Sequence, residues 1–402
     1  MSKWVRQNIT WSTSYLASDH FFINSIHLVL YTLEEHTPVI NKMGYPDTFE
    51  GFCVDSPKTW NKFSKQELKP KPFEDYDIDV EIAACGVCGS DIHTLTGGWG
   101  DFQGPLCVGH EVVGRAVRVG SKVRSEIKEG DRVGVGAQVW ACLKCKVCES
   151  KNENYCPHMV DTYNAKYEDG SSAHGGYASH IRAHEYFTFK IPDGLETEIA
   201  APLLCAGITV YSPLFRAGVG PGKKVAVVGI GGLGHLGVQF SKALGAETYA
   251  ITHSKNKVED AKKLGAKEVI VSSDKDWHKP YAFTFDFILN AADALDQFDL
   301  PAYMSTLNIE GQFHTVGISD KPVPQLTAFA FAPNAAKLTG SHLGNHQEMD
   351  AMLKLAAEKN VRPWVETIDV SEEGCKKAVE GVKDNKVRYR YTLTGFDKAF
   401  SR

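Results

Sequence analysis

Hydrophobic and polar positions follow two different patterns along this 402-residue chain, and the change falls near residue 200. Between about 50 and 190, apolar residues occur in short alternating runs that glycine and proline interrupt. Alternation with a period of two, broken by turn residues, is typical of half-buried strands. We therefore expect a barrel-like all-β region, whose clearest strands are Asp77–Ala83, Val112–Val119 and Arg132–Val135.

From about residue 200 the pattern changes to apolar strands that alternate with helices, one of them Lys257–Leu264. Strands separated by helices build a parallel sheet that is covered on both faces, so a doubly wound nucleotide-binding fold is predicted. Six runs read as its strands: Val225–Val228, Glu247–Ser254, Glu268–Val271, Phe285–Ala291, Gly311–Val316 and Lys337–Gly340.

The last part of the chain returns to strand patterning. An amphipathic helix, Met349–Glu358, precedes the runs WVETIDV and VRYRYTL, which we expect to rejoin the first domain. The predicted organisation is an N-terminal extension over 1–42, a catalytic domain over 43–199, a nucleotide-binding domain over 200–345 and a return to the catalytic domain over 346–402.

Residues 1–42 differ from the rest of the chain. Basic, Ser and Thr residues occur there with no acid before Asp19, which weakly resembles a transit peptide. The apolar run Phe21–Tyr31 is interrupted by polar residues and is too short to span a bilayer. Because Met43 begins a segment that looks like a natural start, we interpret residues 1–42 as a dispensable extension rather than a targeting signal.

Composition narrows the possible functions. With 43% hydrophobic and 23% charged residues, the chain has an ordinary globular composition. A net charge of -5 gives no basic surface for nucleic acid, and we expect neither a nucleic-acid nor a membrane partner. Its ten cysteines cluster at metal-ligand spacing in a large chain without a convincing signal peptide, so a reducing compartment, the cytoplasm, is predicted.

Four cysteines, Cys142, Cys145, Cys148 and Cys156, follow the spacing C-x2-C-x2-C-x7-C. Four thiolates on one short loop can surround a structural zinc ion tetrahedrally. Two disulfides are the alternative, which a reducing compartment disfavours. The sequence therefore predicts a structural zinc site.

The loop Gly229-Ile230-Gly231-Gly232-Leu233-Gly234 matches G-x-G-x-x-G, and it joins an apolar strand to a helix. In such a loop the first glycine permits a tight turn, the second lets the backbone approach a pyrophosphate, and the third allows the helix to pack closely on the strand. The helix N-terminus also attracts phosphate. We predict dinucleotide contacts from Gly229, Gly231, Gly232, Leu233 and Gly234.

The end of the next strand distinguishes the two dinucleotides. An acid there would hold the ribose 2′-hydroxyl of NAD, but this chain has Thr252, His253, Ser254 and Lys255, with Lys257 nearby. No carboxylate repels a 2′-phosphate, while the serine can donate a hydrogen bond and the lysines can supply positive charge. The alternative is that the two lysines form a solvated first turn of a helix, but that does not explain the missing acid. NADP is therefore predicted.

A second metal centre is indicated by Cys88, His110 and Cys205, which lie far apart in sequence, as ligands brought together by folding usually do. Three protein ligands leave the fourth zinc position open for a substrate oxygen. Cys85 and Cys88 form a CxxC that could be a redox pair, although no second CxxC remains to complete a structural zinc site. Cys205 is the weakest candidate, since its apolar neighbourhood also suits a buried structural cysteine.

The motifs CGVCGSDIH, GHEVVGRAVRVGSKV, APLLCAGITVYSPL, GIGGLG and VRYRYTL, together with the four-cysteine loop, resemble the zinc-dependent medium-chain alcohol dehydrogenases. More narrowly, they are similar to the NADP-dependent cinnamyl alcohol dehydrogenase branch, from about residue 43 to the C-terminus. The resemblance implies a GroES-like β-barrel catalytic domain formed by both chain ends, an inserted Rossmann domain with a doubly wound parallel sheet, and a homodimer joined through the Rossmann sheets.

The resemblance also implies roles around the catalytic zinc. Cys205 becomes the third ligand, and Glu111 becomes a transient ligand that can occupy the open position when substrate is absent. Asp91 corresponds to the carboxylate that orients the zinc-bound histidine, here His110.

Further roles concern the proton and the cofactor. The resemblance implies that Ser90 passes a proton to the product oxygen and that His93 connects that buried hydroxyl to solvent. By spacing alone, these two residues could be a turn hydroxyl and a surface histidine. Arg388 aligns with an arginine that reaches cofactor phosphate, with Arg390 as the alternative register. Gly89 departs from the family pattern, because many relatives have histidine at this position. Without that histidine, we expect one phosphate contact to be lost.

These assignments predict a zinc- and NADP(H)-dependent enzyme that reversibly reduces aldehydes, both cinnamaldehyde-like and medium-chain aliphatic, to primary alcohols. Trp99 could line an aromatic-friendly pocket, or could simply be a core residue. An NAD-dependent polyol dehydrogenase would need an acid near Thr252–Ser254, and a zinc-free quinone reductase would lack the ligand cysteines. A non-catalytic NADPH-binding protein would not need the metal ligands and the proton relay.

Overall fold

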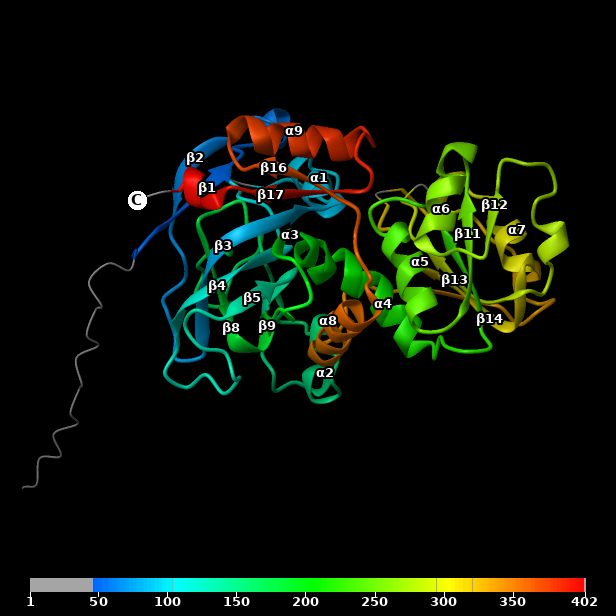
Figure 1. The fold of residues 1–402 in the computed structure, drawn as a ribbon, viewed down its shortest axis with the longest axis horizontal. Helices are drawn as coiled ribbons and strands as arrows, with labels where there is room; N and C mark the ends of the chain where they lie inside the picture. The colour runs from blue at the N-terminus through cyan, green and yellow to red at the C-terminus, as the bar shows by residue number, and fades with distance from the viewer. Residues whose placement is uncertain (1–45, 103, 294, 320, 401–402) are drawn as a thin grey trace, which may run out of the picture. The chain divides into compact units, whose positions relative to one another are not determined.

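A computed structural model describes residues 46–102, 104–293, 295–319 and 321–400 (Figure 1). All of these belong to one unit, Pro46–Arg402. The interpretation of residues 1–42 as an extension lies outside the described residues.

Six parallel strands form the nucleotide-binding sheet, in the order β12-β11-β10-β13-β14-β15. This order is that of a doubly wound dinucleotide-binding fold, as predicted. All six expected strands are present, although β14 begins at Leu307 rather than Gly311. Their bounds are β10 Lys224–Val228, β11 Glu247–Thr252, β12 Glu268–Val271, β13 Phe285–Asn290, β14 Leu307–Thr315 and β15 Lys337–Gly340.

A second, seven-stranded sheet combines strands from both ends of the described chain. Its order is β16-β17-β3-β4-β5-β9, with β8 also paired to β3. The C-terminal β17 runs antiparallel to β3, with Tyr391 opposite Val87, so β17 lies beside the end of β3 that leads into Cys88. The strands are β3 Asp77–Val87, β4 Val112–Val119, β5 Arg132–Val135, β8 His180–His184, β9 Thr188–Lys190, β16 Val365–Asp369 and β17 Arg390–Thr394.

Four short strands form two hairpin-like pairs outside these sheets, β1 Phe49–Cys53 with β2 Ser64–Leu68 and β6 Gln138–Trp140 with β7 Val160–Asp161. The helices are α1 Gly89–Leu95, α2 Lys146–Glu149, α3 Thr197–Ala200, α4 Ala206–Arg216, α5 Gly234–Ala243, α6 Val258–Leu264, α7 Leu300–Ser305, α8 His346–Lys359, α9 Glu372–Lys383 and α10 Phe396–Ala399. Two 3-10 turns matter for the site, η4 Ala201–Leu204 and η5 Lys255–Lys257.

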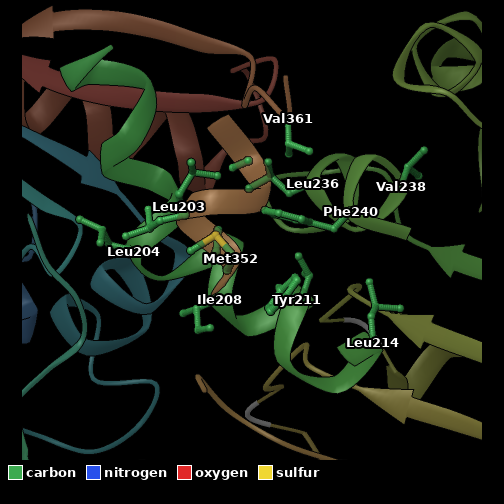
Figure 2. Packing of buried hydrophobic residues seen from close by; sticks show 14 of the residues in the cluster. Leu203, Leu204, Ile208, Tyr211, Leu214, Leu236, Val238, Phe240, Met352 and Val361 are labelled. Atoms are coloured by element: carbon green, nitrogen blue, oxygen red, sulfur yellow. The ribbon is translucent and has the colours of Figure 1, made fainter. Parts of the chain in front are cut away.

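An apolar core joins the two sheets through α4, α5 and α8 (Figure 2). Tyr211 of α4 packs edge-on against Phe240 of α5, with ring centroids 5.6 Å apart, and Met352 of α8 is fully buried in the same cluster. The first turn of α5 belongs to the glycine-rich motif. The core therefore fixes that loop relative to Cys205, which immediately precedes α4.

Several helices were not expected from the pattern, among them α1 and α9. The segment after Cys88 forms helix α1, whose start is capped by the Asp91 carboxylate, which accepts a hydrogen bond from the Cys88 amide at 2.9 Å. Helix α9 begins at Glu372 and is capped by Ser371, whose hydroxyl accepts a hydrogen bond from the Gly374 amide at 2.9 Å.

Among the described residues, no single helix is long and apolar enough to cross a membrane. One pair bent by 55°, Thr197–Leu204 with Ala206–Arg216, passes by length and composition only.

Candidate active site and metal centres

Four buried side chains converge at the edge of the seven-stranded sheet. One potential ligand atom from each of Cys88, His110, Glu111 and Cys205 lies within 4.8 Å of the others. Cys88 caps α1 at the end of β3, His110 and Glu111 precede β4, and Cys205 joins η4 to α4. Folding therefore brings together the three ligands predicted from distant segments, with the acid beside them.

The His110 ring is held by one of its nitrogens and leaves the other free. Nδ1 lies 3.3 Å from the Asp91 carboxylate and 3.1 Å from the Tyr163 hydroxyl. Nε2 is buried and has no hydrogen-bond partner among the described residues. A buried imidazole nitrogen without a partner is costly, whereas two thiolates and one imidazole nitrogen are a donor set that suits zinc. The residues present therefore fit a zinc ion.

Asp91, fully buried on α1, supports both ligand segments. Its Oδ2 accepts a hydrogen bond from the Cys88 amide at 2.9 Å, and its Oδ1 accepts one from the Gly109 amide at 3.2 Å. The same carboxylate contacts His110. This arrangement agrees with the orienting role that the resemblance implies for Asp91.

Glu111 points away from solvent and pairs with Arg390 of β17. Arg390 Nη2 lies 2.6 Å from Glu111 Oε1 and 2.5 Å from Oε2, and both side chains are buried. Burial raises the pKa of Glu111 to about 8, although the attraction of Arg390 opposes the rise. Gly86 makes room for this carboxylate, since a Cβ there would overlap Glu111 Oε2.

The four loop cysteines form a separate cluster around α2. Their Sγ atoms lie 3.5 Å apart for Cys142 and Cys156, 3.6 Å for Cys145 and Cys148, 3.9 Å for Cys145 and Cys156, and 4.0 Å for Cys142 and Cys148. A tetrahedral ZnS4 site with bonds of about 2.3 Å has sulfur-sulfur edges of about 3.8 Å. These separations fit a zinc ion.

The remaining alternatives for the cysteines do not hold. All ten cysteines are free, so the four-cysteine loop does not form two disulfides. Cys85 is fully buried, burial raises the pKa of its thiol, and its Sγ donates to the Gly86 carbonyl at 3.5 Å. A thiol with a raised pKa is a poor nucleophile, which disfavours a redox pair with Cys88.

The glycine-rich loop has the geometry that a pyrophosphate needs. Gly229 has φ +83°, in the left-handed region that favours glycine. A Cβ at Gly234 would overlap the Gly229 carbonyl oxygen, whereas one at Gly231 would meet nothing within 4 Å. The tight turn and the open face above Gly231 therefore fit a bound dinucleotide. Gly232 and Leu233 complete the loop between β10 and α5.

The two arginines of VRYRYTL, Arg388 and Arg390, contact different parts of the structure. A Cβ added at Gly232 would lie 3.0 Å from Arg390 Nη1, so Arg390 faces the glycine-rich loop. Arg388 instead pairs with Asp260 at 3.2 Å and donates to the Asn256 carbonyl at 3.3 Å. The resemblance implied Arg388 for the cofactor phosphate, with Arg390 as the alternative register. Of the two, Arg390 is the buried one and lies beside the glycine-rich loop, because β17 starts there.

The predicted 2′-phosphate residues lie at the end of β11 and in η5. Thr252 is buried, and its hydroxyl accepts a hydrogen bond from the Ser254 amide at 3.4 Å. Burial lowers the pKa of Lys257, and so does the positive charge of Arg388, which lies nearby. Lys255 is exposed and lies 3.7 Å from Asp274, and His253 is also exposed. Asp260 on α6 pairs with Arg388 at 3.2 Å and accepts a hydrogen bond from the Tyr389 hydroxyl at 2.6 Å.

The proposed proton relay lies on one face of α1. Ser90 Oγ is 3.7 Å from Cys88 Sγ, and His93 follows three residues later, on the same side of the helix. The His93 ring stacks on Trp99, with centroids 4.9 Å apart and planes 7° apart. Trp99 is 43% exposed, so it is not the core residue that was the alternative.

Two residues of this region, Tyr163 and His235, were missed by sequence reasoning. Tyr163 contacts His110 but follows it by 53 positions and belongs to no motif. Arg390 was named only as an alternative, and His235, directly after the glycine-rich loop, was not considered. Of these residues, only His235 could have been found from the sequence, because it directly follows the motif GIGGLG.

Comparisons with known proteins agree with this geometry. Residues 74–193 match the alcohol dehydrogenase GroES-like domain, and residues 232–358 match the zinc-binding dehydrogenase family. NADP-dependent alcohol dehydrogenase 6 of Saccharomyces cerevisiae is 46% identical over 360 residues, which are 89% of this chain and 100% of that protein.

Solved structures give the same picture. A cinnamyl alcohol dehydrogenase from Sorghum bicolor superposes with a TM-score of 0.82 at 33% identity, over 88% of this chain and 99% of that chain. The structure of CAD from Helicobacter pylori complexed with NADP(H) gives a TM-score of 0.78 at 30% identity, over 86% and 98% of the two chains.

The chain belongs to the zinc-binding alcohol dehydrogenases, which combine a GroES-like domain with a Rossmann domain. Within that family it is an NADP-dependent alcohol dehydrogenase of the branch that includes the cinnamyl alcohol dehydrogenases, and its cofactors are zinc and NADP. A small alcohol or aldehyde is its substrate. These findings confirm the predicted family, fold class, enzyme class and cofactors.

Proposed function

We propose that this enzyme reduces aldehydes to primary alcohols with NADPH, at a zinc ion held by Cys88, His110 and Cys205. One observation carries the proposal: the Arg390 guanidinium contacts Glu111 of the metal centre and also faces Gly232 of the nucleotide loop. The buried Arg390 side chain therefore reaches from the metal centre to the nucleotide loop. Hydride transfer requires this proximity, because the carbonyl and the nicotinamide must meet.

The two cofactors supply the reactive chemistry. Zinc, when bound, polarises the carbonyl oxygen and stabilises negative charge on it. NADPH, when bound, delivers the hydride. The chain positions both: Asp91 and Tyr163 fix the His110 ring, while Gly231 leaves the backbone open for the pyrophosphate. Glu111 lies within reach of the same centre and is proposed as a transient ligand.

The proton needed at the alcohol oxygen is supplied along α1. Ser90 is close to Cys88 and can donate its hydroxyl proton at the metal centre. His93, on the same face of the helix and partly exposed, can return a proton from solvent. Stacking on Trp99 holds the His93 ring in place.

Selectivity for NADPH rests on the loop after β11. We assign the 2′-phosphate to Thr252, His253, Ser254, Lys255 and Lys257. Arg388 lies close to Lys257 and pairs with Asp260, so this acid is engaged and is not free to repel a phosphate. Positive charge without a free carboxylate favours a phosphate over a hydroxyl.

The exposed face of Trp99 supports an aromatic-friendly entrance, so we propose cinnamaldehyde-like aromatic aldehydes and medium-chain aliphatic aldehydes as substrates. The test is oxidation of NADPH by the purified protein with cinnamaldehyde and hexanal, together with zinc content. We expect two zinc ions per chain, turnover of both aldehydes and a strong preference for NADPH over NADH. Loss of turnover in Cys205→Ser, with one zinc fewer, would support the ligand assignment; turnover unchanged in that variant would contradict it.

A homodimer is proposed through the edge of the six-stranded sheet. Among the strands of the described residues, β15 pairs only with β14. Exposed apolar side chains lie in and after β14, including Ile309 at 63% and Phe329 at 84% exposure. An open strand edge with apolar neighbours is a favourable pairing surface. Light scattering during gel filtration tests it: twice the chain mass is expected, and Ile309→Lys should shift the mass toward the monomer. A monomeric wild-type protein would contradict the proposal.

We also propose a cytoplasmic location, since ten free cysteines suit a reducing compartment. Cell fractionation tests this, and recovery in an organelle lumen or the medium would contradict it.

A further inference from the structure

His235 is the second residue of α5, directly after the glycine-rich loop, and is fully buried. Its Nδ1 lies 2.8 Å from the Gly231 carbonyl oxygen, and its Nε2 lies 3.3 Å from the Trp364 amide nitrogen. A carbonyl oxygen can only accept a hydrogen bond and an amide N–H can only donate one. The two contacts therefore require the neutral ring with its proton on Nδ1.

The segment that His235 reaches joins α8 to β16 and so connects the two sheets. Gln239, one turn later on α5, holds the same segment: its Nε2 donates to the Arg362 carbonyl at 2.8 Å, and its Oε1 accepts from the Arg362 amide at 3.0 Å. Residues Arg362–Trp364 are thus bonded along one face of α5. Unlike the Gln239 side chain, the His235 side chain also contacts the nucleotide loop, at the Gly231 carbonyl.

The other side of this segment is bonded to the start of β17. The Trp364 carbonyl accepts hydrogen bonds from the Tyr389 and Arg390 amides, each at 3.0 Å. The Tyr389 ring also stacks on His235, with centroids 5.2 Å apart. Arg390 carries the guanidinium that faces Gly232 and pairs with Glu111.

An unbroken series of contacts therefore runs from the Gly231 carbonyl through the imidazole and the Trp364 peptide to Arg390. We propose that His235 is a positioning residue for the cofactor: its neutral ring fixes the glycine-rich loop to the connecting segment, so that the Gly231–Gly232 backbone and Arg390 meet the pyrophosphate in one set geometry. The inference rests on the proposed assignment of this loop and Arg390 to NADPH.

Proton transfer is excluded as the role of this ring. Burial lowers the pKa of His235 to about 3, and both nitrogens are already committed to the backbone. A ring that stays neutral across the working range of an enzyme is suited to position groups and not to exchange protons. Its effect should therefore appear in cofactor binding.

Three substitutions separate the two contacts. His235→Asn can keep an N–H near Gly231 but is too short to reach Trp364, and His235→Gln can reach Trp364 but loses the Gly231 contact. His235→Leu removes both and keeps an apolar side chain beside Tyr389. Gln239→Leu is the matched control, because it removes two bonds to the connecting segment without touching the loop.

The experiment measures the dissociation constant of NADPH by fluorescence titration of the zinc-loaded enzyme, with thermal stability and KM for cinnamaldehyde determined on the same samples. Each His235 variant should bind NADPH roughly 3- to 10-fold more weakly, the size of one lost hydrogen bond, while KM for the aldehyde stays within about twofold. Gln239→Leu should lower the melting temperature but leave NADPH affinity unchanged.

Hydrogen exchange supplies a second readout. In the wild-type enzyme, NADPH should slow exchange in the peptide that contains the Trp364 amide, and this protection should be lost in His235→Asn. NADPH affinity equal to wild type in all three variants, or equal losses in Gln239→Leu, would overturn the inference. If the wild-type protein itself does not bind NADPH, the proposed function fails instead, so the two failures are distinguishable.

Discussion

Replacing Gly86 by alanine tests the geometry around Glu111. A Cβ at this position would overlap Glu111 Oε2 and would lie 3.0 Å from both Cβ and Cδ of the same side chain. Ordinary Cβ contacts lie between 3.4 and 4 Å, so the whole carboxylate must move. Its partner cannot easily follow, because Arg390 is only 3% exposed and is already packed against Gly232.

The cost follows from burial. Glu111 and Arg390 have side-chain exposures of 0% and 3%, and separating a buried ion pair costs about 3–5 kcal/mol. At about 2–4 °C per kcal/mol, Gly86→Ala should melt roughly 6–20 °C below the wild type. NADPH-dependent turnover should fall as well, since Arg390 and the metal centre are both displaced.

Gly89→Ala is the matched control, three residues along the same chain. A Cβ there meets nothing within 4 Å, and alanine is the better helix former in α1, so stability should change by less than about 1 kcal/mol. The assay is differential scanning calorimetry of the zinc-loaded proteins, with kcat/KM for cinnamaldehyde measured in parallel. Equal melting temperatures for Gly86→Ala and Gly89→Ala would refute this account of the Glu111 pocket.

Three further predictions concern the structural zinc, the cofactor and pH. Cys148→Ser removes one of four thiolates, so elemental analysis should find one zinc fewer per chain and the melting temperature should fall. Ser254→Asp places a carboxylate beside the 2′-phosphate, so the ratio of kcat/KM for NADPH over NADH should drop roughly tenfold or more. The folded-state pKa of His235 is about 3, against an ordinary 6.5, so the unfolded chain binds the extra proton as the pH falls from 6.5 toward 3 and stability is lost in that window. His235→Gln lacks this loss, so the gap in unfolding free energy between it and the wild type should narrow by about 2 kcal/mol between pH 7 and pH 5 in urea titrations.

Each of these has a contrary result. Two zinc ions per chain in Cys148→Ser would contradict the four-thiolate site. An unchanged cofactor ratio in Ser254→Asp would remove that residue from the 2′-phosphate contacts. A gap that stays constant between pH 7 and pH 5 would show that the His235 ring is not held neutral by its surroundings.

Local patterns in the sequence were enough to predict the nucleotide-binding sheet. Each of its strands is an apolar run bounded by turn residues, and the ends of β12 and β15 were located without error. The zinc loop was equally accessible, because its four ligands lie on one short segment whose spacing alone restricts the chemistry. The helix α1 was not predicted, since it begins with Gly89 and depends on one capping carboxylate, Asp91.

Contacts between residues far apart in sequence could not be predicted from local patterns. Nothing in the neighbourhood of Tyr163 indicates that its hydroxyl reaches His110 across 53 residues. The choice between Arg388 and Arg390 likewise depended on where β17 begins, and a shift of two residues keeps a side chain on the same face of a strand. Only the pairing of β17 with β3, which places Tyr391 opposite Val87, brings Arg390 to Glu111.

The most direct test of the central claim is to follow the hydride itself. The zinc-loaded enzyme would be incubated with cinnamaldehyde and NADPH that carries deuterium at the transferable position, and the alcohol would be analysed by mass spectrometry. We predict one deuterium at the alcohol carbon for each NADPH oxidised, with Cys205→Ser giving none. Alcohol without deuterium, or equal transfer by Cys205→Ser, would contradict the account.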